Sequence, residues 1–480
     1  MKQQRLRFKL LALFLFGLFA VLAVYGGYAI TTYGNRWFAY ARNPRIRAQK
    51  ENVIAGDVLD RSGVVLATTV NGQRVYQSNE ASRRAVVHLL GDDQGQVSNG
   101  VETFQSNYLY GFQASLPELV SSLFDGQPRR GDSVTLTIDS QLCTAIVKAF
   151  DAHSLTKGKN GAAVVMNYRT GETLGTVSLP TFDPMNITEA TVNDPGQPFW
   201  NRATQSVYPP GSGFKVITTD AALTSIPGIQ SADIACSGNL TVAGQVIRDY
   251  GGAVHNSLSL KRAFMTSCNN AYAWLALTMK DEALRRAAES FGFNDNFLFK
   301  DIVVENSVYP TTNRTSFELA TSGFGQSAIV ASPMHMCLVA AAIANNGVMM
   351  EPQLLRQVTS VSGAVRRSFS PRVYRTATTA ANAAVIQEYM RSVVTGGTGT
   401  RAAVSGLTVC GKTGSAESSL NGRAITYGWF IGYIADDSLP FALAVVVEDI
   451  PDGEGGGSTA APIAGDIFQY LKDHQAQVTQ

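Results

Sequence analysis

An uninterrupted apolar stretch near the N-terminus is the strongest pattern along the chain. Residues 10–30 carry no charged side chain, and four of the nine residues before them are Lys or Arg. A helix rises about 1.5 Å per residue, so this stretch spans about 30 Å, the thickness of one bilayer core. Because the apolar part of a cleaved signal peptide is shorter, at roughly 7–15 residues, the pattern predicts a membrane anchor that is not cleaved.

Charge gives little information on how this anchor is oriented. Basic residues precede the span, and five more follow it between residues 36 and 50. The positive-inside rule therefore barely distinguishes the two sides. Since a short basic N-terminal tail usually stays inside, we expect residues 1–9 to be a cytoplasmic tail. Residues 10–30 would then be a single transmembrane anchor in the cell membrane, with the rest of the chain on the extracytoplasmic side.

Beyond the anchor, short β-like runs give way to a more regular pattern at about residue 130. Residues 134–139 alternate as a strand, and residues 140–150 have helical periodicity. Two apolar runs within 161–178, joined by Tyr-Arg-Thr-Gly, predict a β-hairpin. We place a boundary between about 130 and 160, which separates an N-terminal domain (31–155) from a C-terminal domain (156–475).

The C-terminal region has strands at both ends and a helix-rich middle. Helical patterns occupy residues 212–225, 258–279, 281–290, 333–346, 377–395 and 463–474. Two strand patterns, 425–435 and 439–450, lie close to the C-terminal end. This arrangement predicts an α+β fold, with an antiparallel sheet that is assembled from both ends of the segment and flanked by helices.

Composition narrows the class of protein without identifying it. The 480 residues are 45% hydrophobic and 16% charged, which indicates a folded chain of two or three domains. The net charge of +2 gives no reason to expect a nucleic-acid partner. The five cysteines are scattered without a C-x-x-C spacing, so we expect small buried side chains and no metal site. Met334-His335-Met336-Cys337 lies in a predicted buried helix and is read in the same way.

The segment "GLTVCGKT", residues 406–413, admits two opposite interpretations. It matches the phosphate-binding loop G-x-x-x-x-G-K-[ST], and it also contains Lys-Thr-Gly followed by Ser415. A phosphate loop needs a flexible loop and a helix directly after it. Here the loop would be the β-prone Leu-Thr-Val-Cys, and turn residues and a strand follow. The pattern therefore favours a β-hairpin with Lys412, Thr413 and Gly414 on its first strand.

Ser212 and Lys215 form a candidate nucleophile and base. Pro209, Pro210 and Gly211 prevent a helix before Ser212, so a helix is expected to begin there. Residues three apart share one helix face. A buried lysine whose pKa is lowered by desolvation and by a second cation can take the proton of a serine hydroxyl. The alternative reading of Ser-x-x-Lys is a helix cap followed by a solvated lysine.

A third motif, Ser267-Cys268-Asn269, comes just before an apolar helical run. A serine there can relay a proton and an asparagine can hold a substrate amide, although helix capping is the simpler reading of such residues. The occurrence of Ser-x-x-Lys, Ser-x-Asn and Lys-Thr-Gly in this order is the signature of penicillin-binding proteins and class A β-lactamases. Cys268 stands where the usual motif of those enzymes has Asp.

With these three motifs, residues 161–468 resemble the transpeptidase domain of class B penicillin-binding proteins. Further blocks that resemble the family are "GAAVVMNYRTGETLGTVSLPTFDP", "GFGQSAIVASPMHMCLVAAAIANNGVMMEP" and "YGWFIGY". "GDVLDRSGVVLA" resembles the start of the family's N-terminal pedestal. The resemblance implies a β-rich, non-catalytic pedestal over 31–155, a penicillin-recognising transpeptidase domain over 156–475, and a short type without C-terminal accessory repeats.

The resemblance also assigns roles to the motif residues. Ser212 would be the acylated nucleophile, Lys215 its general base, and Ser267 the group that passes a proton to the leaving D-alanine. Asn269 would hold the donor peptide, and Lys412 would set the local field. The substrate carboxylate would be bound by the segment Thr413-Gly414-Ser415. Gly213 and Ser415 each stand where the family usually has Thr, and neither change removes a catalytic group.

The implied function is D,D-transpeptidation of peptidoglycan stem peptides through a serine acyl-enzyme, without a cofactor or metal. β-Lactams would be covalent inhibitors, and a SEDS-type glycosyltransferase of the cell-wall machinery would be a membrane partner. A D,D-carboxypeptidase or a β-lactamase remains an alternative, although the long N-terminal pedestal argues against a β-lactamase. A catalytically silent β-lactam sensor or scaffold is the alternative outside the enzyme class.

Overall fold

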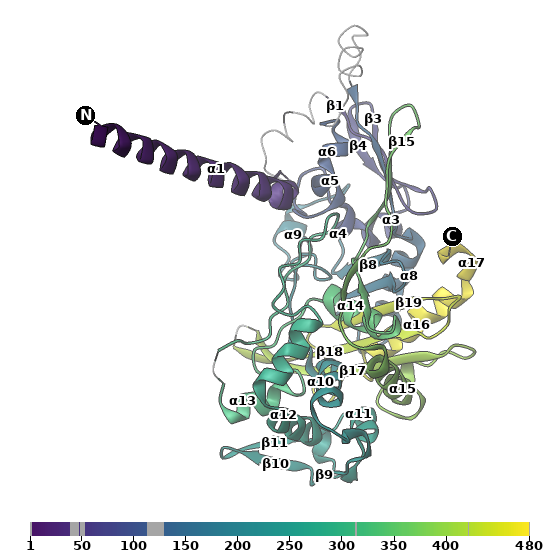
Figure 1. The fold of residues 1–480 in the computed structure, drawn as a ribbon. Coiled ribbons are helices and arrows are strands. Elements are labelled where there is room, and N and C mark those ends of the chain that lie inside the picture. The colour runs from purple at the N-terminus through teal and green to yellow at the C-terminus, as the bar shows by residue number, and fades with distance from the viewer. Residues whose placement is uncertain are drawn as a thin grey trace.

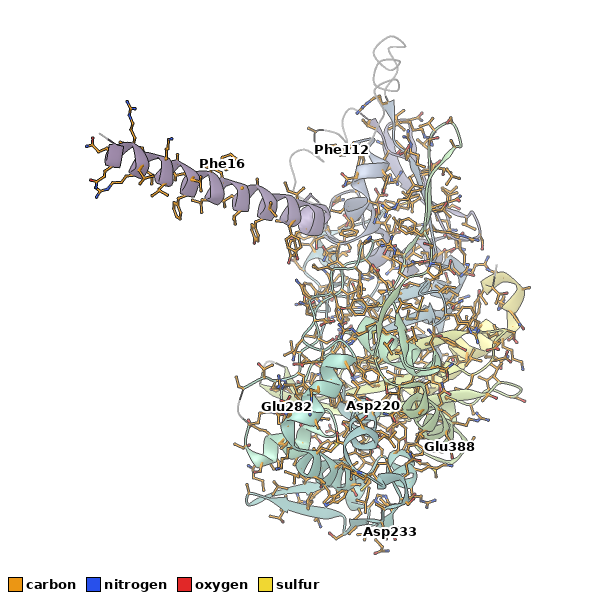
Figure 2. All side chains as sticks on the ribbon, viewed as in Figure 1. Phe16, Phe112, Asp220, Asp233, Glu282 and Glu388 are labelled. Atoms are coloured by element: carbon orange, nitrogen blue, oxygen red, sulfur yellow. The ribbon has the colours of Figure 1, made fainter. Side chains whose placement is uncertain are left out.

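The computed structural model describes residues 2–38, 48, 53–112, 129–312, 314–420 and 422–479. A long N-terminal helix, α1 (Lys2–Phe38), projects from an elongated body in Figure 1. Within the described residues, one helical segment is long and apolar enough to cross a membrane, Gln3–Ile30, and none of its most apolar window is buried. Side chains such as Phe16 extend from this helix away from the body (Figure 2). These features agree with the single anchor predicted at 10–30.

The end of the body nearest α1 is built on a six-stranded mixed sheet of order β15-β14-β6-β2-β3-β4. Strand β6 pairs in parallel with β2 and antiparallel with β14. Residues from both sides of the predicted boundary at 155/156 therefore share one sheet. The strands of this sheet are β2 (Val58–Leu59), β3 (Val65–Val70), β4 (Gln73–Tyr76), β6 (Ser133–Leu136), β14 (Leu355–Thr359) and β15 (Val365–Ser368).

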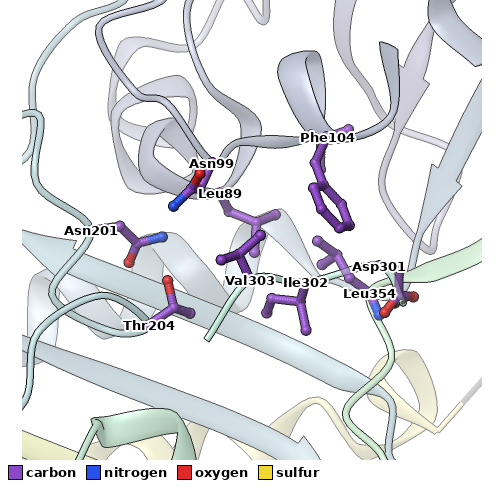
Figure 3. Close-up of a pocket in the computed structure, with 10 residues that line it drawn as sticks. Leu89, Asn99, Phe104, Asn201, Thr204, Asp301, Ile302, Val303 and Leu354 are labelled. Carbon is purple, nitrogen blue, oxygen red and sulfur yellow. Dashed lines mark hydrogen bonds between the residues drawn. The ribbon is translucent and has the colours of Figure 1, made fainter. Parts of the chain in front are cut away.

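In the described part of the chain between β4 and β6, four short helices occur where the sequence has no clear periodic pattern. Two of them pack against residues 301–303 of the C-terminal region, where Leu89 of one helix and Phe104 of the other approach Ile302 (Figure 3). In the same contact, the Asp301 carboxylate accepts hydrogen bonds from the backbone N–H groups of Leu354 and Leu355 at 2.9 and 2.8 Å. The helices are α3 (Glu80–Ala85), α4 (Val87–Leu90), α5 (Val101–Phe104) and α6 (Ser106–Leu109).

A five-stranded antiparallel sheet of order β17-β18-β19-β7-β8 forms the centre of the C-terminal region. This confirms the predicted antiparallel sheet that draws strands from both ends of the segment. Helices α8 and α16 pack together on it, and α14 packs against β7, β18 and β19. The elements are β7 (Gly161–Asn167), β8 (Thr173–Leu179), β17 (Val409–Leu420), β18 (Arg423–Ile434), β19 (Phe441–Val447), α8 (Ser140–Ala152), α14 (Pro333–Ala344) and α16 (Ala460–Asp473).

A lobe of helices and short strands covers the β17 end of this sheet (Figure 1). Its helices are η1 (Gly211–Phe214), α10 (Lys215–Ser225), α11 (Leu260–Thr266), α12 (Asn269–Ser290), α13 (Ser316–Ser322) and α15 (Ala380–Gly396). Its strands are β9 (Ile234–Cys236), β10 (Asn239–Val242), β11 (Gln245–Arg248) and β12 (Asn256–Leu258). The lobe carries the serine motifs and brings them to the edge of the sheet.

The single helix predicted over 258–279 is wrong. The helix ends at Thr266, Ser267 adopts a left-handed conformation with φ 59°, and α12 begins at Asn269. The predicted helix at 281–290 is instead the second half of α12, which contains one non-helical residue, Lys280. A left-handed serine costs backbone energy and persists only where surrounding contacts hold it. Those contacts lie in the candidate site described next.

The remaining described elements are short. They are β1 (Val53–Ile54), β5 (Arg129–Arg130), α9 (Glu189–Val192), η2 (Ile229–Ser231), η3 (Tyr250–Gly252), β13 (Val348–Met350), β16 (Val373–Thr376), η4 (Thr400–Ala402) and α17 (Gln475–Val478). Strands β1 and β5 pair with each other, as do β13 and β16.

Candidate active site

Strand β17 forms one wall of the candidate site. It pairs with β18 along its whole length, with Lys412 opposite Ile431 and Ser415 opposite Gly428. The predicted hairpin is therefore confirmed, and the phosphate-loop interpretation is wrong, because Lys412 and Thr413 lie in a strand that no helix follows. Since β17 is at one end of the sheet order, its second edge is turned toward η1.

The turn that carries Ser212 packs directly against this edge. A Cβ atom on Gly211, which has φ +52°, would lie 2.4 Å from the carbonyl oxygen of Ser415. A Cβ atom on Gly414 would lie 2.9 Å from the carbonyl oxygen of Pro210. Two glycines therefore permit a backbone approach that larger residues would block. The indole of Trp429 donates to Pro209 O at 3.1 Å and fixes the entry to the turn.

Ser212 lies one helical turn before Lys215, as the motif predicts, although the local geometry differs. The residues 211–214 form a 3₁₀ turn, and the α-helix begins at Lys215. In a 3₁₀ turn the side chains at i and i+3 are eclipsed, so Ser212 and Lys215 still share one face. The Lys215 side chain is completely buried, whereas Ser212 is half-buried.

Both lysines of the motifs converge on Ser267. Lys215 Nζ donates to Ser267 O at 2.6 Å and to Asn269 Oδ1 at 2.9 Å, and it lies 3.2 Å from Ser267 Oγ. Lys412 Nζ donates to Ser267 Oγ at 3.0 Å and to Thr413 O at 2.9 Å. The five predicted catalytic positions thus occupy one region, in which Ser267 is the residue that both amines contact.

Burial determines the protonation of these two amines. Desolvation lowers the pKa of Lys215 to about 7, although Cys268 and Asp249 partly oppose the shift. Desolvation, with a smaller effect from the charge of Lys215, holds the pKa of Lys412 well below its usual value. The Tyr272 ring lies 5.0 Å from Lys215 Nζ, and the Phe264 ring 5.7 Å from Lys412 Nζ. Aromatic faces offset part of the cost of burying each cation.

The hydrogen bonds of Lys215 suit a neutral amine that acts as a base. A neutral amine has two hydrogens and one lone pair. The Ser267 carbonyl and the Asn269 side-chain oxygen can only accept, so they take both hydrogens. The lone pair is then available to a hydroxyl group. A serine hydroxyl on the same face can transfer its proton there.

The predicted substrate-binding segment contacts two loops, one that follows α15 and one that precedes α16. Thr413 Oγ1 lies 2.6 Å from Thr398 Oγ1, and Ser415 Oγ accepts from Gly456 N at 3.2 Å. Gly414 lies between them at the close approach to Pro210 described above. The three positions therefore line the wall beside Ser212.

The residues that support the Ser267 turn were not predicted from the sequence. Asp249 Oδ1 accepts hydrogen bonds from the backbone N–H groups of Asn269 and Asn270 and so caps α12. All five cysteines are buried, as expected. They were expected to lie far apart, and this is wrong for Cys236 and Cys268, whose sulfur atoms are 3.4 Å apart. No local motif indicated this contact, because β9 and α12 meet only in the folded lobe.

Replacing Gly211 by alanine tests the close approach of the Ser212 turn to β17. We expect a destabilisation of about 1–3 kcal/mol from the left-handed backbone and the clash. We also expect acylation by a β-lactam to slow by about 10²-fold, since a misplaced nucleophile loses orientation. Thermal unfolding and gel labelling would measure the two effects.

Gly228→Ala is the matched control, because Gly228 also has a positive φ, 72°, yet nothing lies within 4 Å of a Cβ atom there. It should cost only about 1–2 kcal/mol of backbone strain and leave acylation unchanged. Equal loss of acylation in both variants would contradict a specific role for the approach.

Comparisons with known proteins agree with this geometry. The family described as penicillin binding protein transpeptidase domain matches residues 161–469. The peptidoglycan D,D-transpeptidase PbpA of Mycolicibacterium smegmatis is 30% identical over 391 residues, which cover 77% of this chain and 78% of that protein. The penicillin G acyl-enzyme complex of penicillin-binding protein A from M. tuberculosis is 27% identical, with a TM-score of 0.78 over 87% of this chain and 99% of that one. Its imipenem acyl-enzyme complex has a TM-score of 0.77, at 27% identity, over 88% and 99% of the two chains.

Proposed function

The chain belongs to the penicillin-binding protein transpeptidase family, and we propose that it is a peptidoglycan D,D-transpeptidase that cross-links stem peptides in cell-wall synthesis. The observation that carries this proposal is the convergence of two buried amines, Lys215 and Lys412, on Ser267, beside the turn that bears Ser212. It supports a serine acyl-enzyme mechanism with a lysine base. Acyl-enzyme complexes of a similar protein with β-lactams support the same chemistry.

In the first step, Ser212 Oγ attacks the carbonyl carbon of the D-Ala-D-Ala peptide bond. Its proton passes to the neutral amine of Lys215, and the negative charge develops on the carbonyl oxygen. The C–N bond then breaks. Ser267, which contacts both lysines, delivers a proton to the departing amine, and D-alanine leaves.

In the second step, an amine from a neighbouring stem peptide attacks the ester carbonyl. The amine loses a proton, the bond to Ser212 Oγ breaks, and the serine hydroxyl is restored. Backbone N–H groups of Ser212 and Ser415 would stabilise the oxyanion in both steps, and the close approach of their two segments supports this assignment. A β-lactam enters the first step and leaves an acyl-enzyme.

The edge of β17 suits an extended peptide. An edge strand offers unpaired backbone groups that a peptide can join as an added strand. Thr413 and Ser415 supply hydroxyl groups for the terminal carboxylate, and Lys412 supplies a positive field. Asn269, whose orientation is fixed by Lys215, would hold an amide of the donor peptide.

The location and partner of the enzyme follow from its substrate and its anchor. Peptidoglycan lies outside the membrane, so the catalytic part should be extracytoplasmic, with the basic residues 1–9 inside. Family resemblance suggests a SEDS-type glycosyltransferase that contacts α1 and the N-terminal β-rich region. The division into domains at 155/156 remains a prediction. Strands from both sides of it share one sheet, so the two parts would be in direct contact.

A donor and acceptor assay tests the proposed reaction. The purified full chain would be incubated with a stem peptide ending in D-Ala-D-Ala and with a second stem peptide that carries a free amine. We expect mass spectrometry to find a cross-linked product that has lost one D-alanine. Trimmed donor alone, with water as the acceptor, would instead support a D,D-carboxypeptidase. No turnover in a folded protein that binds no β-lactam covalently would support the scaffold alternative.

A further inference from the structure

Four side chains with metal-binding atoms meet directly behind the Ser267 turn. They are Cys236 at the end of β9, Asp249 before η3, His255 before β12, and Cys268 at the start of α12. Their sulfur, oxygen and nitrogen atoms all lie within 4.8 Å of one another. Three of the four side chains are almost fully buried, with exposed fractions of 1% for Cys236, 4% for Asp249 and 1% for Cys268. His255 is half-buried.

The geometry points to a tetrahedral site for a zinc-like divalent ion, and we propose that this cluster holds one. Two thiolates, an imidazole and a carboxylate are the ligands that zinc prefers. With zinc–sulfur bonds of about 2.3 Å and zinc–nitrogen or zinc–oxygen bonds of about 2.0–2.2 Å, ligand atoms would stand about 3.3–3.8 Å apart.

The distances in the cluster come close to that range. Cys236 Sγ and Cys268 Sγ are 3.4 Å apart, and they lie 2.9 and 3.1 Å from Asp249 Oδ2. His255 Nδ1 lies 3.3 Å from both Cys236 Sγ and Asp249 Oδ2. An outward shift of Asp249 by a few tenths of an ångström would bring its two short contacts with sulfur into that range, and the remaining pair, His255 with Cys268, lies within 4.8 Å. Because four protein ligands fill a tetrahedron, the site would be structural and would leave no position for substrate.

The supporting contacts of the cluster also fit a metal site. The second oxygen of Asp249 accepts hydrogen bonds from the backbone N–H groups of Asn269 and Asn270, which would hold the carboxylate in a fixed orientation. Ala271 N lies 3.3 Å from Cys268 Sγ and can donate to a thiolate. Partners of this kind orient metal ligands and raise the affinity for the ion.

The ion would act on catalysis through position alone, and this part of the inference rests on the proposed function. Cys268 is flanked by Ser267, whose left-handed backbone must be held, and by Asn269, which binds Lys215. A metal bond to Cys268 and Asp249 would anchor both neighbours of Ser267 without touching the substrate. Cys236, Asp249, His255 and Cys268 are therefore positioning residues in this inference.

Metal content and spectroscopy test the site independently of activity. The full chain, purified under reducing conditions without chelators, should contain about one zinc per chain, the stoichiometry of a single structural site. Replacement of zinc by Co²⁺ should give the intense visible absorption of a tetrahedral site and a charge-transfer band from the thiolates. Removal of the ion by a strong chelator should lower the melting temperature, and added zinc should restore it.

Two ligand variants and one control variant distinguish loss of the metal site from general effects of mutation on the protein. Cys236→Ser, and the milder change His255→Gln at a half-buried position, should each weaken binding of Co²⁺ by at least about 10-fold. Cys337→Ser alters a buried cysteine on α14, outside the cluster, and should retain the ion. Both ligand variants should also slow β-lactam acylation, and zinc in excess should partly restore the rate in His255→Gln.

Several outcomes would overturn the site. The first is wild-type protein that neither carries zinc nor binds Co²⁺. The second is a His255→Gln variant whose affinity for Co²⁺ is unchanged. The third is a Cys236–Cys268 disulfide found by mass spectrometry in protein isolated from the membrane. Metal binding and acylation are measured separately. A protein that holds one ion but is never acylated would retain the metal site and refute the proposed function.

Discussion

Replacing Ser212 by alanine is expected to abolish covalent labelling by a fluorescent penicillin and to lower transpeptidation by at least about 10³-fold. We do not expect the nearby hydroxyl group of Ser267 to take its place. Ser267 is held by both lysines and has a left-handed backbone, whereas Ser212 lies on the turn that packs against β17. Removing the nucleophile of a serine enzyme costs several orders of magnitude, because the remaining binding groups give only weak catalysis. Gel labelling of a soluble protein that begins near Thr31 would measure the effect.

Ser225→Ala is the matched control for this variant. Ser225 is the exposed last residue of α10, the helix that follows Ser212. It should label like the wild type. Persistent labelling of Ser212→Ala would show that another residue is acylated and would refute the assigned nucleophile. A wild-type band that fades within seconds would indicate rapid hydrolysis, and hence a β-lactamase.

The central sheet could be predicted because its strands have clear local patterns. Residues 161–166 and 441–447 are continuous runs without a polar side chain, and in the structure they lie side by side in the sheet. The hairpin of β17 and β18 was marked by β-prone residues on both sides of a turn. The short helices between residues 80 and 109 could not be predicted in the same way. Their apolar positions follow no sustained period, and packing against residues such as Ile302 determines them.

The motifs of the candidate site could be predicted from the sequence, but the contacts between them could not. Ser212, Lys215 and Lys412 could be proposed because each belongs to a short motif of consecutive or nearly consecutive residues. The exact break at Ser267 could not, because no Gly or Pro marks it, and its polar residues allowed either a helix cap or a continuous helix. The left-handed turn depends on contacts from two distant lysines and on the capping of α12 by Asp249.

The proposed metal-binding cluster could not be predicted from the sequence either. Cys236, Asp249, His255 and Cys268 are separated by strands β10, β11 and β12, so no short metal-binding motif is visible. The pairing of β9 with β12 brings Cys236 close to His255. A search of the sequence for close Cys and His spacing cannot find a site that is assembled by strand pairing.

The rate of acylation by a β-lactam should rise with pH, about tenfold between pH 6 and pH 8. Burial lowers the pKa of Lys215 to about 7, so the amine is mostly protonated at pH 6 and mostly neutral at pH 8. Only the neutral form has a lone pair for the Ser212 proton. Stopped-flow or gel-based acylation rates across this range would measure the profile.

Replacing Lys215 by methionine should slow acylation by about 10²–10⁴-fold, the usual contribution of a general base, and remove the rise with pH. Methionine retains the buried aliphatic volume and avoids an unpaired charge. Lys261→Met, which removes an exposed lysine on α11 that pairs with Glu388, should keep both the rate and the profile of the wild type. If Lys215→Met still showed a rise centred near pH 7, the titrating base would be another group, and Lys412, the second buried amine on Ser267, would be the first to replace.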